Sequence, residues 1–229
     1  MTFKRTLLAA SVAALCTAPT HANLLFSEYL EGSGNNKALE LLNTSAETVD
    51  LAAWEIQVYF NGSSNAGLTV NLNGSIVPGG HFVVASSQAD EAILMVADQT
   101  ISAGLFNGDD AVTLLNGGRV ADSIGQIGVD PGSYWGEDVR TQNATLRRRN
   151  TTPDSDPYDA YEPAAYFDAF PQDSFDDLGE NGADPGTPTD PDPEQPGTPS
   201  LVCGDPVITV SAIQGVGDTS PLDGTAVEI

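Results

Sequence analysis

Short runs of alternating apolar and polar residues, separated by turn residues, make up the chain from residue 23 to about residue 180. In residues 54–60 every second position is apolar, which is the period of a strand with one buried face. Asn116-Gly117-Gly118, between two such runs, is a strong hairpin signal. The pattern predicts strands over residues 24–30, 37–43, 54–60, 68–72, 81–85, 110–115 and 119–124.

One segment has a helical rather than a strand period. Ala89, Ala92, Ile93 and Val96 are spaced so that they share a face of a short helix within residues 89–97. Many short strands with frequent turns and at most one short helix are typical of a β-sandwich or barrel. The sequence therefore predicts an all-β fold.

The first 22 residues have the three parts of a secretory signal peptide. Lys4 and Arg5 form a charged start, residues 7–16 form an apolar run too short to span a bilayer, and residues 20–22 form a small-residue cleavage site. We therefore expect export of the bacterial type and a secreted, extracellular product. No second apolar run of membrane-spanning length follows in the sequence.

The composition changes after residue 180. Residues 181–200 are acidic and rich in proline, a composition that cannot bury apolar area, so we expect a disordered, extended linker. Residues 201–229 read as two further strands, which cannot bury a core of their own, so we expect the truncated start of a second β module. Cys203, the one cysteine left after signal cleavage, is expected to pair with a cysteine beyond residue 229 or to be a free thiol.

The charge of the chain limits its partners. It has 8 basic and 32 acidic residues and a formal net charge of −24. Such a balance disfavours adventitious binding to nucleic acid or anionic membranes, because phosphate contacts need Lys and Arg. A solvated acidic surface is one interpretation, and binding of divalent cations is the alternative.

Acidic turn residues are the candidates for a Ca²⁺ site. Asp109 and Asp110 follow Asn107-Gly108, and Asp154 and Asp156 form a second cluster. Carboxylate and carbonyl oxygens in turns are the ligands that Ca²⁺ uses, although neither cluster has the spacing of an EF-hand. The alternative is that these are solvated turn acids, which hydrogen-bond to their own backbone.

Two further groups of residues are candidates for contacts. Arg147 and Arg149 belong to the main basic cluster and could touch DNA phosphates, or they could pair with nearby acids, and alternation along a strand would separate neighbouring arginines onto two faces. Trp54 is expected in the core. Trp135, in a loop, is the better candidate for an exposed contact, and the alternative is that it pins this long loop to the sandwich.

The sequence offers few residues for catalysis between residues 23 and 180. His81 has no histidine, cysteine or serine constellation around it in sequence, and we expect it to be structural or exposed. Glu28 and Glu40 lie on neighbouring predicted strands, where paired carboxylates can act as acid and base. The alternative is that both glutamates lie on an outward face and have structural roles.

Several motifs together resemble a lamin-tail domain. They are the run LFSEYLEGSGNNKALELLN (residues 25–43), residues 106–112, 122–125, the strand 145–149 and the closing residues 173–179. The resemblance implies an immunoglobulin-like β-sandwich, similar to those at the front of bacterial secreted nucleases of the endonuclease/exonuclease/phosphatase type. Residues 213–222 likewise resemble the opening of the OB-like module that precedes the nuclease domain in such proteins.

The resemblance implies a function for residues 23–180 and for a longer parent protein. The sandwich would be a monomeric, non-catalytic adaptor without a cofactor of its own, and the catalytic domain would lie beyond residue 229. The parent would be a secreted deoxyribonuclease that needs Mg²⁺ or Ca²⁺ and has DNA as its substrate. A secreted adhesion or matrix-binding module is the alternative, and a hydrolase site within residues 23–180 is a third possibility.

Overall fold

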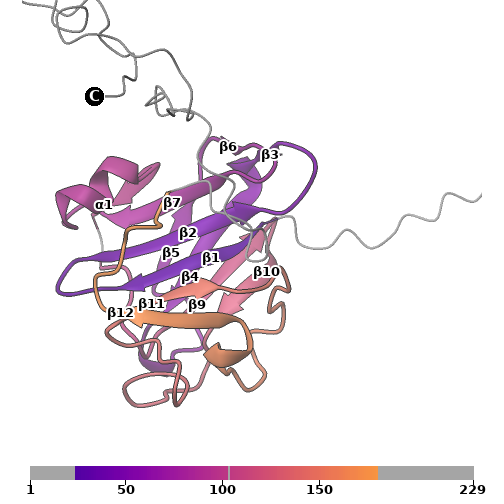
Figure 1. Ribbon diagram of the computed structural model, residues 1–229. Helices are drawn as coiled ribbons and strands as arrows, with labels where there is room; N and C mark the ends of the chain where they lie inside the picture. Colours follow the sequence, from indigo (N-terminus) through magenta and orange to yellow (C-terminus); the bar gives the residue numbers. More distant parts are fainter. Residues whose placement is uncertain (1–23, 103, 180–229) are drawn as a thin grey trace, which may run out of the picture. The chain divides into compact units, whose positions relative to one another are not determined.

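Two sheets packed face to face form the domain in a computed structural model that describes residues 24–102 and 104–179 (Figure 1). In spatial order, the larger sheet contains β12 (Phe167–Pro171), β11 (Ala144–Arg148), β1 (Leu24–Glu31), β2 (Lys37–Asn43), β7 (His81–Ser86) and β8 (Gln99–Ile101). The smaller sheet contains β10 (Arg119–Ile124), β9 (Ala111–Asn116), β4 (Trp54–Tyr59) and β5 (Leu68–Asn71). Neighbouring strands are antiparallel except for β7 and β8, which are parallel. The fold is an all-β, immunoglobulin-like sandwich.

The remaining elements are short. A two-stranded ribbon joins β3 (Val49–Asp50) to β6 (Ser75–Ile76). The predicted helix is present as α1, which is shorter than expected (Glu91–Val96). Single 3-10 turns are η1 (Leu51–Ala53), η2 (Phe60–Gly62) and η3 (Pro163–Ala165).

The strands predicted from alternation are confirmed to within about one residue at each end. Sequence reasoning missed β3, β6 and β8, which have two or three residues each and are too short to show a period. It also missed β12, where only Phe167 is buried. The signal peptide, the linker, the second module and Cys203 lie outside the described residues.

The space between the sheets is filled by apolar side chains from both of them. Trp54, Ile56 and Val58 of β4 are buried, as expected, and alternate with half-exposed neighbours. From the larger sheet, Phe26 and Tyr29 of β1 enter the same core. The ring of Tyr29 stacks on Phe106 with centroids 4.6 Å apart.

The outer face of the larger sheet is also covered. Leu30, Ala38, Val83 and Ala85 on this face form a second apolar cluster with Ala89 and Ile93 near α1 and with Leu178. Leu178 belongs to a C-terminal strap, which we define as residues 172–179. Because both faces of the sheet are covered, β1 is buried at nearly every position and does not alternate.

Truncating Leu178 should destabilise the domain. The side chain is 2% exposed, whereas Met95 on α1 is 80% exposed. Leu178→Ala should lower the free energy of unfolding by about 2 kcal/mol or more, since it removes buried methyl groups and leaves a cavity. Met95→Ala, the matched control, should change it by less than about 0.5 kcal/mol. Urea denaturation measures both, and equal effects of the two changes would show that the strap does not seal the sheet.

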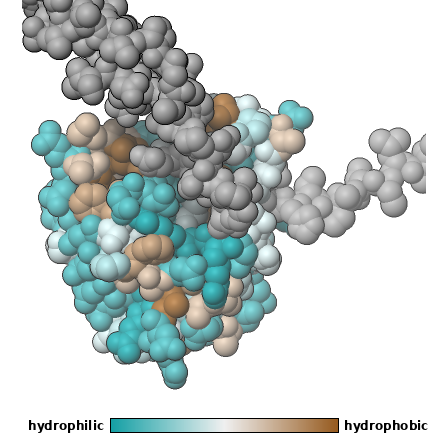
Figure 2. Space-filling view, viewed as in Figure 1, coloured by the Kyte–Doolittle hydropathy of each residue, from teal (hydrophilic) through white to brown (hydrophobic). Residues whose placement is uncertain are grey.

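Most of the surface seen in Figure 2 is hydrophilic, and apolar side chains gather near α1. Met95 and Val96 of this helix are among the exposed large apolar residues. Within residues 24–102 and 104–179, no helix has the length and apolar character needed to cross a membrane.

Candidate functional site

A β-bulge in β1 places two neighbouring polar side chains on the outer face of the larger sheet. The register between β1 and β2 shifts between Phe26 and Glu28, so Ser27 is an extra residue on its strand. Phe26 and Tyr29 remain in the core. Bulges of this kind re-aim side chains, and here Ser27 and Glu28 both lie beside Glu40 of β2.

A row of titratable side chains crosses four strands at this bulge. Arg147 of β11 lies opposite Glu28, and Glu28 lies opposite Glu40. His81, the first residue of β7, lies diagonally beyond Glu40. Two carboxyl groups directly opposite each other destabilise a sheet when both are ionised, so the protonation state of Glu28 matters for this pairing.

Glu40 is held by three hydrogen-bonding groups. The Ser27 hydroxyl donates to its Oε1 over 2.6 Å, and Nδ1 of His81 lies 2.6 Å from the same oxygen. The backbone N–H of Gly179 donates to Oε2 over 2.7 Å. Glu40 therefore fixes the end of the C-terminal strap to the sheet.

Glu28 is less well satisfied than Glu40. Its Oε2 accepts a hydrogen bond from Nε of Arg147 over 3.3 Å, whereas its buried Oε1 has no hydrogen-bond partner among the residues that the structure describes. Burial raises the pKa of Glu28 to about 8; the Arg147 guanidinium opposes this increase and the Glu40 carboxyl adds to it. The group is therefore largely protonated at neutral pH.

Arg147 connects this row to the C-terminal strap. Its Nη2 donates to Asp176 over 2.8 Å, and its Nε lies 3.6 Å from Asp177. The guanidinium carbon also lies 4.4 Å from the ring centroid of Phe170. The Arg147 guanidinium thus lies within ion-pair distance of three carboxyl groups, those of Glu28, Asp176 and Asp177.

These side chains surround a cavity of about 410 Å³, which we call the outer-face cavity. The cavity is lined by residues 42–45, 79, 150–151 and 177, together with Ser27, Glu28, Glu40, His81, Arg147 and Arg148. Sequence reasoning placed the two glutamates on an outward face, but both are buried because the strap crosses over them. The bulge that brings Ser27 into the site gives no signal in the apolar pattern.

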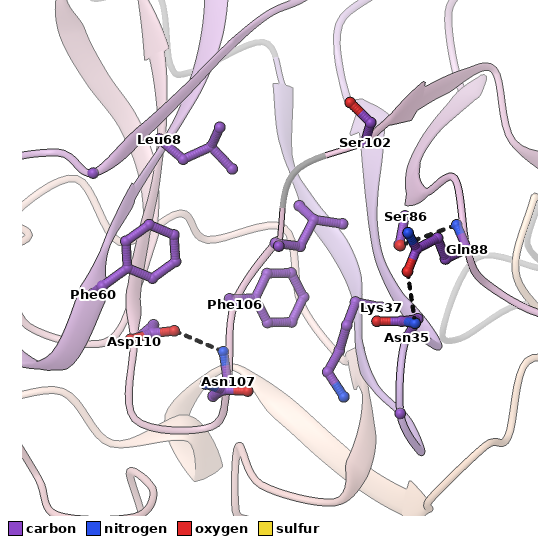
Figure 3. Close-up of a pocket in the computed structure, with 14 residues that line it drawn as sticks. Asn35, Lys37, Phe60, Leu68, Ser86, Gln88, Ser102, Phe106, Asn107 and Asp110 are labelled. Atoms are coloured by element: carbon purple, nitrogen blue, oxygen red, sulfur yellow. Dashed lines mark hydrogen bonds between the residues drawn. The ribbon is translucent and has the colours of Figure 1, made fainter.

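A second cavity of about 410 Å³ opens at one edge of the sandwich (Figure 3). Phe60 and Leu68 lie on one side of it, and Asn35, Lys37 and Gln88 lie on the other. Nζ of Lys37 lies 2.8 Å from Glu31, and the Asn35 amide donates to Gln88 over 2.9 Å. Lys37, Asn35 and Gln88 of this cavity are thus already engaged by other side chains.

Arg148 points in the direction opposite to Arg147, into the space between the sheets. It pairs with Asp122 of β10, and both side chains are almost fully buried. The guanidinium also donates to the carbonyl groups of Phe26 and Thr152. Burial raises the pKa of Asp122, whereas Arg148 and three backbone N–H groups act in the other direction. This pair joins the two sheets.

The acidic turn residues proposed for Ca²⁺ are in part buried, which corrects their interpretation as solvated acids. Asp110 accepts hydrogen bonds from the backbone N–H groups of Asn61 and Asn107 over 2.8 and 2.7 Å. Asp154 is also buried, and desolvation raises its pKa to about 6, with nearby Asp159 contributing. Asp109 and Asp156 are less buried.

No group of three or more His, Cys, Asp or Glu side chains in the described part of the chain is arranged to hold a metal ion.

Removing the Asp110 carboxylate should destabilise the loops that it caps. Asn61 has a left-handed backbone with φ of 50°, and its N–H is bound by this side chain. Asp110→Ala should cost about 1–3 kcal/mol, since it leaves two part-buried backbone N–H groups without their acceptor. Asp109→Asn is the matched control and should be nearly neutral. Thermal unfolding with and without Ca²⁺ shows whether Asp110 acts as a backbone cap or as a metal ligand. If it is a cap, the variant loses the same stability in both solutions.

Trp135 is buried, which contradicts the expectation of an exposed contact. Its side chain is 6% exposed and packs edge-on against Tyr161, with centroids 6.2 Å apart. Gly125, at φ of 81°, allows this approach, because a Cβ there would lie 2.7 Å from the indole nitrogen of Trp135. The tryptophan therefore pins its long loop to the sandwich. Arg149, the other proposed contact, is partly exposed and lies 3.5 Å from Asp168.

The comparison with protein-family models agrees with the sequence resemblance over part of the chain. Residues 17–128 match the family model of the Lamin Tail Domain, a β-sandwich of the binding or adaptor type. No curated protein matches the sequence. Among solved structures, the chain is similar to a DUF4876 family protein from Bacteroides thetaiotaomicron VPI-5482, at 11% identity and a TM-score of 0.39, covering 67% of this chain and 69% of that chain. The lamin-tail prediction is thus supported over residues 17–128.

Proposed function

We propose that this chain is the secreted adaptor end of a metal-dependent deoxyribonuclease. The match to the Lamin Tail Domain supports a binding or adaptor role for the sandwich. The motifs in residues 25–43 and 173–179, which resemble the front domains of bacterial secreted nucleases, support the link to such an enzyme. The signal-like first 22 residues support export.

The adaptor role is supported mainly by the structural contacts that the polar side chains of the sandwich make. The residues that could have served catalysis instead hold the sandwich together. Glu40 ties the strap to the sheet, and Arg148 with Asp122 joins the two sheets. Asp110 caps two backbone N–H groups. A domain whose acidic and basic side chains stabilise its fold is suited to presenting a binding surface to a partner.

In this proposal the chemistry belongs to a domain that follows residue 229. That domain binds Mg²⁺ or Ca²⁺ and cleaves DNA. The sandwich holds the enzyme near a surface, a partner or its substrate.

The test is a DNA-impregnated gel of secreted protein from the native source, aligned with a blot against residues 23–180. We expect an immunoreactive band larger than 23.8 kDa to clear DNA with added Mg²⁺ or Ca²⁺ and to lose this activity in a chelator. A single band of the chain's own mass that clears nothing would reject the nuclease parent. The adhesion or matrix-binding module would then be the better proposal.

A further inference from the structure

Carboxyl groups gather at the outer-face cavity and at its rim. Four carboxyl groups belong to it or to its rim, from Glu28, Glu40, Asp176 and Asp177. Arg147 lies within ion-pair distance of three of them. The net charge of the chain, −24, attracts cations toward the surface as a whole.

A second observation points to a missing hydrogen-bond partner at one position. Glu28 is 2% exposed and lines the cavity, and its Oε1 has no hydrogen-bond partner within the described residues. A buried carboxyl oxygen without a partner is costly. Arg148 also lines the cavity, but its guanidinium points between the sheets, where it is bound to Asp122, and so it does not donate to this oxygen.

We propose that the outer-face cavity binds an alkylammonium group, the cationic end of a lysine side chain or of a polyamine, with Glu28 as its main partner. This binding site does not depend on the nuclease assignment.

The shape and lining of the cavity suit an ammonium group on an aliphatic stem. An ammonium ion is compact and has three donors that turn freely, whereas a guanidinium needs a planar, forked acceptor. Leu42 offers apolar contact for the stem, and the Ser45 and Thr151 hydroxyls are further acceptors. Asp177, which also lines the cavity, is 52% exposed and lies 3.6 Å from Arg147, so its carboxylate is a further acceptor at the rim.

Binding should release a proton, because the ammonium pairs with the ionised carboxylate. The pKa of Glu28 near 8 makes the carboxyl largely protonated at pH 7, so affinity should rise between pH 6 and pH 8. The charged and titratable groups that face Glu28 are Arg147 on β11, Glu40 on β2, His81 on β7 and Asp176 and Asp177 on the strap.

The experiment titrates the full chain with Nα-acetyl-lysine-methylamide, with spermidine and with the Nε-acetylated lysine as an uncharged control. The backbone amide of Gly179, which donates to Glu40, reports binding through its NMR chemical shift. We expect saturable shifts with the two amines and none with the acetylated lysine. Glu28→Gln should weaken binding about tenfold or more, since it removes a charge-assisted partner. Glu55→Gln, on the smaller sheet, is the matched control and should leave it unchanged.

The arms of the titration also identify the source of the ammonium group. Binding of the lysine derivative alone indicates a protein partner, and binding of spermidine alone indicates a small polyamine. Equal affinity in the wild type and in Glu28→Gln, both with intact amide spectra, would overturn the proposal. So would shifts at Gly179 with Ca²⁺ but with neither amine.

Discussion

Arg148→Met should be among the most destabilising single changes in this domain, lowering the free energy of unfolding by about 3–5 kcal/mol. The change leaves Asp122 buried with its charge unpaired. It also removes the donors to the carbonyl groups of Phe26 and Thr152. The change also removes the cation–π contact between Arg148 and Phe167, in which the guanidinium carbon lies 4.6 Å from the ring centroid.

Urea denaturation at pH 7 with a double-mutant cycle tests the origin of this loss. Arg148→Met combined with Asp122→Asn should cost clearly less than the sum of the two single changes, because the second change removes the unpaired charge. Arg148→Lys keeps the charge but not the planar fork, so it should give an intermediate loss. Additive single effects would show that packing, rather than the ion pair, joins the sheets.

The strands were readable from the sequence because most of them have one buried face and one exposed face. In β4 the buried Trp54, Ile56 and Val58 alternate with more exposed neighbours, and this is the signal that periodicity detects. The same reasoning failed at β12, where Phe167 is the sole buried residue and its partner strand decides the structure. The local apolar pattern therefore predicts most strands, whereas the edge strand β12 depends on pairing with a distant segment of the chain.

The site was much less readable than the fold. Glu28 and Glu40 were recognisable as a pair of carboxylates on adjacent strands, but their burial depends on residues 172–179, more than 130 positions away in the chain. The bulge at Ser27 shifts the register without breaking the apolar pattern. From its loop position alone, Trp135 could be an exposed contact or an anchor for the loop, and only the contact with Tyr161 shows that it is the anchor.

Glu28 should make the domain less stable as pH rises from about 5 to about 8. Its pKa is raised from an ordinary value of 4.5 to about 8 in the folded protein, so between these values the folded state keeps a proton that the unfolded state has lost. The free energy of unfolding must then fall with increasing pH, by at most about 1.4 kcal/mol per pH unit for this group. The contribution is complete below pH 4.5 and is lost above pH 8.

Comparison with Glu28→Gln isolates this effect from the other acids, since glutamine resembles the protonated carboxyl at every pH. Near pH 5 the variant and the wild type should have similar stabilities, and near pH 8 the variant should be more stable by on the order of 2–4 kcal/mol. Glu47→Gln, at an exposed position, should follow the wild-type curve. Urea denaturation at four pH values between 5 and 8 measures all three proteins. Parallel curves for the wild type and Glu28→Gln would show that Glu28 is already ionised at pH 5. The outer-face cavity would then hold its carboxylate without an added cation.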